Sequence, residues 1–97
     1  MDRRYQPLTP QQQAQARKQL YATLAEQPGL SIPDTLRLIR LSLRLTRADL
    51  AKLSGLSVRY ISQLEKGEGN PTLAAIESVL KPFGLRLGCL LSPANPS

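Results

Sequence analysis

The chain has 97 residues, with 13 Lys and Arg against 7 Asp and Glu, one Cys and no His. At about 150 residues per domain, this length predicts one domain. The lack of His excludes His-based catalytic groups and Cys/His zinc sites, and a single Cys excludes an intramolecular disulfide. No apolar run reaches the roughly 20 residues of a membrane span, and Met1-Asp2-Arg3-Arg4 does not begin a secretory signal. The net charge of +6 favours a binder of a polyanion, with no metal and no cofactor.

The N-terminal part predicts a flexible segment followed by one helix. Residues 1–8 show no periodicity, which is typical of a free chain end. Thr9-Pro10-Gln11-Gln12 combines a capping box with proline in the first turn, and Pro28-Gly29 is a stop signal. We therefore expect an additional helix within residues 9–29, running from Pro10 to about Glu26, with apolar side chains only near its end.

Capping residues and glycines predict four more helices in residues 31–84. Ser31-Ile32-Pro33-Asp34 and Thr46-Arg47-Ala48-Asp49 are further capping boxes, and Ser57 and Thr72 are good N-caps. Helices are expected from Ser31 to about Leu43, from Thr46 to Ser54, from Ser57 to about Lys66, and from Thr72 to Pro82. The fold class is therefore all-α.

The C-terminal part changes its period. Leu85, Leu87, Cys89 and Leu91 alternate with the residues between them, so residues 85–91 are predicted to form a short strand, followed by a disordered tail at 92–97. A helical chain offers this strand no partner. Either it pairs with the same strand of a second copy, or it packs as an extended tail on its own domain. Cys89 is interpreted as a small packing residue rather than an intersubunit disulfide.

Residues 46–67 have the layout of a helix-turn-helix, with Gly55 in the turn. On a helical wheel of residues 57–66, Ile61 and Leu64 define the buried side. The opposite side carries basic and uncharged polar side chains and no acid, namely Arg59, Ser62, Gln63 and Lys66, flanked by Val58 and Tyr60. Arg suits guanine and Gln suits adenine in a DNA major groove, although the same stripe also fits a solvated face.

Residues 35–80 resemble the Xre family of phage-repressor and Cro-type helix-turn-helix proteins. The resemblance rests on these runs at the family's spacing: Ile39-Arg40, Leu45-Thr46, Asp49-Leu50-Ala51, Gly55-Leu56-Ser57, Tyr60 to Gly67, and Asn70-Pro71-Thr72-Leu73. It implies a lambda-repressor-like helix-turn-helix bundle that binds double-stranded DNA through the helix at 57–66.

The resemblance also implies a role for particular residues. The base-contacting positions are Val58, Arg59, Tyr60 and Gln63, where Val58 would meet a thymine methyl group or only pack. The phosphate-contacting positions are Thr46, Arg47, Ser57, Ser62, Lys66 and Asn70. Arg40 and Glu65 match a buried ion pair of the family, so Glu65 is interpreted as structural rather than catalytic.

Two departures from the family pattern suggest further surfaces. Leu41 and Leu43 are apolar where the family is polar, so either the N-terminal helix covers them or a partner protein does. The tail is similar to that of HipB-type antitoxins, in which a strand pair joins two subunits; Leu85, Leu87, Cys89 and Leu91 would then mediate dimerisation.

We therefore expect a homodimeric repressor that is cytoplasmic, on the nucleoid, and binds a palindromic operator. The alternative is an antitoxin that neutralises a partner toxin and autoregulates its operon. An enzyme is not expected.

Overall fold

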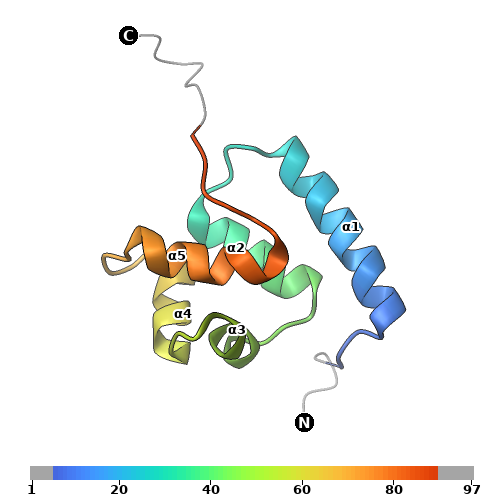
Figure 1. Cartoon of the computed structure of the whole chain (residues 1–97), viewed down its shortest axis with the longest axis horizontal. Helices are drawn as coiled ribbons and strands as arrows, with labels where there is room; N and C mark the ends of the chain where they lie inside the picture. The colour runs from blue at the N-terminus through green and yellow to red at the C-terminus, as the bar shows by residue number, and fades with distance from the viewer. Residues whose placement is uncertain (1–5, 90–97) are drawn as a thin grey trace, which may run out of the picture.

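The computed structural model describes residues 6–89, which form a small helical bundle (Figure 1). Its elements in chain order are α1 (Pro10–Glu26), α2 (Ile32–Ser42), α3 (Arg47–Ser54), α4 (Val58–Lys66), α5 (Leu73–Leu80) and the 3-10 turn η2 (Lys81–Phe83). The all-α prediction is confirmed, and each helix begins and ends within a residue or two of the expected position.

Local capping explains these boundaries. The capping boxes at Thr9 and Thr46 are complete. Each threonine side chain accepts the backbone N–H of the third helical residue, and the side chain of that residue accepts the backbone N–H of the threonine. The predicted box at Ser31 is only half formed. Ser31 Oγ accepts the N–H of Asp34 at 3.2 Å, but the Asp34 carboxylate pairs with Arg37 instead of the cap backbone.

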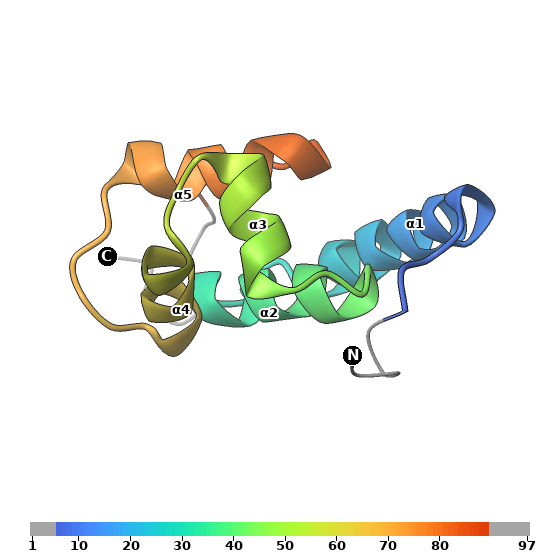
Figure 2. The same ribbon diagram turned by 90° about the horizontal axis from the view of Figure 1, so that it is seen from below.

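The core lies where α2, α3, α4 and α5 meet, and α1 packs on one side of it. Leucine and isoleucine fill it, and Phe83 of η2 closes it from the C-terminal side. Of α1, only Leu20 is fully buried, and Figure 2 shows the N-terminal half of this helix projecting beyond the bundle. The helix is therefore docked mainly through its C-terminal half.

Polar contacts reinforce the docking of α1. The hydroxyl of Tyr21 donates to the carbonyl of Phe83 at 2.7 Å, and the guanidinium of Arg17 lies 5.6 Å from the centre of the Phe83 ring. The predicted cover of α2 by α1 is only partial, because Leu43 is buried while Leu41 stays 60% exposed.

In the single chain, residues 85–89 form an extended segment without regular secondary structure, so the predicted strand pair between two copies stays a prediction; Leu90, Leu91 and the tail at 92–97 lie outside the described residues. Within residues 6–89 no second strand faces this segment, and its one backbone bond runs from the Leu85 N–H to the Leu80 carbonyl at 3.2 Å. Leu85 and Leu87 are half-buried against the core, as in a tail packed on its own domain. Cys89 is exposed in the single chain, so its interpretation as a packing residue of a paired strand stays a prediction.

Candidate nucleic-acid interface

A tight connection holds α3 and α4 in a helix-turn-helix. Gly55 ends α3 in the left-handed conformation, at φ 76°, and its N–H donates to the Ala51 carbonyl at 2.9 Å. Ser57 then caps α4 by accepting the N–H of Tyr60 at 3.0 Å. Local hydrogen bonds fix both the end of α3 and the start of α4. The angle between the two helices is therefore set within residues 54–57 and by the packing of α3 on α4.

The α4 helix has one side in the core and one side in solvent. Ile61 and Leu64 are buried, as the wheel predicts, while Arg59 and Lys66 are exposed and Val58 is 48% exposed. Neither Arg59 nor Lys66 forms an ion pair with any residue between 6 and 89. The exposed side of α4 therefore presents two uncompensated cations.

Three of the predicted contact residues lie less open than the wheel suggests. Tyr60, Ser62 and Gln63 are all half-buried. Tyr60 packs against the core, and Gln63 lies with Tyr60 around a small hollow that the loop after α4 closes with Asn70 and Pro71. Two backbone hydrogen bonds end α4 before this loop. The N–H of Gly67 donates to the carbonyl of Leu64, and the N–H of Glu68 donates to the carbonyl of Gln63.

The hydroxyl groups at the two helix starts are partly engaged. Thr46 Oγ1 accepts the N–H of Asp49 at 3.0 Å, and Ser57 Oγ accepts that of Tyr60. Neither hydroxyl donates its own hydrogen to a residue within 6–89, and each stands at a helix N-terminus, where orphan N–H groups favour anions. Both positions therefore suit a phosphate oxygen.

A buried ion pair fixes the far end of α4 to α2. Arg40 donates from Nε to Glu65 Oε2 at 2.8 Å and from Nη2 to Oε1 at 3.0 Å, and the Glu65 side chain is 1% exposed. This is the pairing that the family resemblance implies. A carboxylate so enclosed is held inside the bundle, so it does not repel phosphates at the surface of α4.

Two more arginines meet Glu65, and the sequence did not indicate either contact. Arg47 Nε lies 3.5 Å from Glu65 Oε1, with its side chain 45% exposed, and Arg37 Nη1 donates to the Glu65 carbonyl at 3.0 Å. The Arg37 guanidinium beside Asp34, together with the Ser31 hydrogen bond, lowers the pKa of that carboxyl. Only the spacing of Asp34 and Arg37 by three residues could have suggested part of this network.

A helix-turn-helix family matches residues 36–88, more than half of the chain. The chain belongs to this family, of the Xre, Cro and lambda-repressor type. No curated protein and no solved structure matches it. The family match begins within α2 and runs through η2 to the start of the tail, and α1 lies outside it.

This Xre-type chain is a DNA-binding helix-turn-helix regulator, with α3 and α4 as the helix-turn-helix. In the part of the chain that the structure describes, no helix is long and apolar enough to cross a membrane. Residues 6–89 also hold no cluster of His, Cys, Asp and Glu that could bind a metal ion.

Proposed function

We propose that this regulator is a sequence-specific homodimeric repressor that reads the DNA major groove with α4. The observation that carries this proposal is the charge distribution on α4. Its one acid, Glu65, is buried against Arg40, whereas Arg59 and Lys66 face solvent without an ion pair in residues 6–89. The helix thus presents only cations and apolar or neutral polar groups to a polyanion.

The exposure of each side chain supports a division of roles. Arg59 lies in the first turn of α4 and is assigned to a guanine edge, with Val58 beside it for a thymine methyl group. Half-buried Gln63 is assigned to adenine, and Tyr60 to a neighbouring base. The phosphate contacts are assigned to Thr46, Arg47, Ser57, Ser62, Lys66 and Asn70.

Selection of bound duplexes from a random pool by the full chain tests this function. We expect the winning sites to be palindromic, with half-site centres on the order of 34 Å apart, because two copies of α4 would enter successive major grooves. Enrichment of single half-sites would contradict binding as a dimer but would support sequence-specific binding. Recovery of the unselected pool would contradict sequence reading itself.

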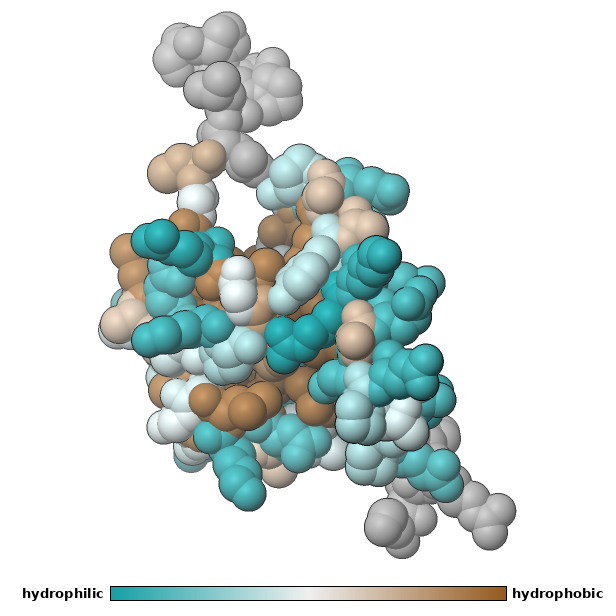
Figure 3. Space-filling view, turned by 45° about the vertical axis from the view of Figure 1, so that its right-hand side comes forward, coloured by the Kyte–Doolittle hydropathy of each residue, from teal (hydrophilic) through white to brown (hydrophobic). Residues whose placement is uncertain are grey.

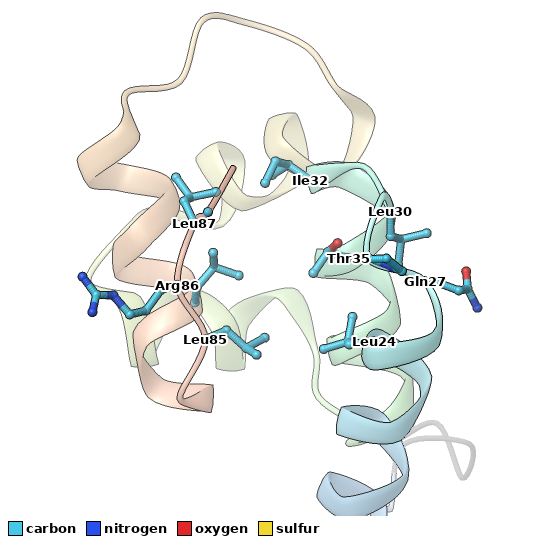
Figure 4. Close-up of a pocket in the computed structure, with 11 residues that line it drawn as sticks. Leu24, Gln27, Leu30, Ile32, Thr35, Leu85, Arg86 and Leu87 are labelled. Atoms are coloured by element: carbon cyan, nitrogen blue, oxygen red, sulfur yellow. The ribbon is translucent and has the colours of Figure 1, made fainter. Parts of the chain in front are cut away.

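We assign dimerisation to the segment that begins at Leu85. Figure 4 shows Leu85 and Leu87 facing Leu24 and Ile32 across a groove of about 220 Å³, with Arg86 pointing away. Apolar side chains are exposed at the surface of the hollow beside this segment (Figure 3). Residues 86–89 use no backbone group in a hydrogen bond within residues 6–89, so a second copy of the segment can pair with them.

Proline substitution separates this pairing from folding. Arg86→Pro combined with Gly88→Pro removes two exposed backbone donors and leaves Leu85 and Leu87 in place. Sedimentation should show that the variant is monomeric while its helical content stays unchanged. A variant that stays dimeric places the dimer interface elsewhere.

An antitoxin is the second candidate, and the exposure of Leu41 favours it. This side chain is 60% exposed on α2 although α1 packs nearby, so a partner toxin would have an apolar contact there. Copurification from the native cell tests this: Leu41→Asp should abolish the recovery of a specific partner and leave DNA affinity unchanged. In both candidates we place the protein in the cytoplasm, on the nucleoid, and assign it no catalytic activity.

A further inference from the structure

A second cleft, of about 440 Å³, lies between the segment before α1 (Pro7 and Leu8), the projecting half of α1, the α2–α3 turn, α3 and η2. No residue of α4 and no residue of the tail lines it. Figure 2 shows the N-terminal half of α1 standing away from the bundle on this side. A molecule bound in the cleft would therefore leave both the DNA-reading helix and the Leu85 segment uncovered.

The cleft has an apolar floor. Leu43 and Phe83 form its buried part, Leu45 is half-buried, and Leu53 opens into solvent at 52% exposure. Leu53 is one of only a few large apolar side chains that the described residues leave this exposed. Such a floor suits two or three apolar side chains of an inserted segment.

The rim of the cleft is positive. Arg17, Arg44 and Lys52 stand on it against one acid, Asp49, whose carboxylate already accepts the Thr46 N–H at 2.8 Å. Arg44 and Lys52 form no ion pair with any residue from 6 to 89. The rim is therefore complementary to acidic groups, which would steer and orient a ligand there.

One buried polar atom beside the cleft lacks a partner. Gln13 lines the cleft, and its Oε1 is buried without accepting a hydrogen bond from any described residue. An orphaned acceptor of this kind is costly in the free protein. A backbone N–H of a bound segment would satisfy it, because the amide oxygen of glutamine is an acceptor.

We propose that this cleft is the docking site for an acidic, apolar peptide segment of a partner protein. The leucine floor would take the apolar side chains, the three cations would pair with flanking Asp or Glu, and Gln13 would accept a backbone N–H. The proposal does not depend on the DNA-binding role, because the cleft shares no residue with α4. It gives the regulator a second surface through which a bound partner can act while α4 stays on DNA.

Peptide selection on the full chain tests this proposal. A random 12-residue display library is selected in excess duplex DNA, which blocks the basic DNA-reading surface, and one winning peptide is synthesised for calorimetric titration. We expect winners that carry net negative charge and two or more large apolar residues. A set of winners without acidic residues would overturn the proposal.

Three variants and one matched control locate the binding. Lys52→Glu and Leu53→Gln should each weaken the peptide by about tenfold, whereas Lys66→Glu, the same charge reversal on α4, should change its affinity by less than about twofold. Gln13→Leu should weaken binding while leaving the melting temperature of the free chain unchanged or higher, since the orphaned oxygen is gone. Loss of binding in Lys66→Glu with no loss in Lys52→Glu would place the peptide on the DNA-reading surface and overturn the proposal.

Discussion

Arg40 and Glu65 lie 25 residues apart, yet the arginine donates to both carboxylate oxygens inside the bundle, at 2.8 and 3.0 Å. The pair joins α2 to the last turn of α4 and so fixes the orientation of the DNA-reading helix in the bundle. Because both groups are almost fully desolvated, each is held in place by the charge of the other.

Removing one member of this pair should destabilise the fold strongly. Arg40→Leu leaves Glu65 buried and without its bidentate partner, so we expect a loss of about 3–5 kcal/mol in the free energy of unfolding, measured in urea. Arg47→Leu is the control: its contact to Glu65 is longer and half-exposed, and it should cost less than about 1 kcal/mol. Equal losses in the two variants would show that Glu65 depends on both arginines alike.

Replacing both members should be far milder than replacing one. The double variant Arg40→Met with Glu65→Leu puts apolar groups of similar size in the same space, so its cost should fall well below that of Arg40→Leu. Equal stability of the single and double variants would mean that lost packing, and not an unpaired charge, causes the effect.

Two backbone positions should respond in opposite directions. Arg44 has φ 53°, in the left-handed region that favours glycine, so Arg44→Gly should stabilise the fold by about 0.5–1 kcal/mol. Gly55 has φ 76° and open space around its Cα, so Gly55→Ala should destabilise by about 1–2 kcal/mol from conformation alone. Thermal unfolding measures the stability of both variants. A Gly55→Ala variant as stable as the original chain would mean that the turn relaxes to a negative φ.

The docking of α1 should depend on one hydroxyl group. Tyr21→Phe removes the bond to the Phe83 carbonyl and should cost about 1 kcal/mol, seen as a lower melting temperature. Tyr60→Phe is the matched change on α4, where the hydroxyl has no partner within residues 6–89, and it should be nearly neutral. If Tyr21→Phe is equally neutral, apolar contacts alone hold α1.

Base reading and phosphate binding should separate on α4. Arg59→Ala should cost about 1–3 kcal/mol on the selected operator and relax the preference at one base pair. Lys66→Ala should weaken all duplexes alike and lower the slope of affinity against salt by about one unit. Binding titrations at several salt concentrations measure both. A uniform loss in Arg59→Ala would reassign that residue to a phosphate.

Much of the candidate site follows from the order of residues. The caps at Thr46 and Ser57 and the glycine stop at Gly55 act within three or four residues, so a local pattern predicts them. The two sides of α4 follow from helical periodicity, which placed Ile61 and Leu64 inside and Arg59 outside. The solvent exposure of each side chain does not follow from periodicity, because neighbouring elements half-bury Tyr60, Ser62 and Gln63.

The sequence by itself determined the helices, their order and the charge of the exposed side of α4, since capping, periodicity and composition are local. Only the tertiary structure decided the rest. It left Leu85 and Leu87 in an extended tail, because a strand needs a partner that the described residues do not supply. It brought Arg47 to Glu65 and left Leu41 and Leu53 exposed, because those outcomes depend on which distant elements pack together.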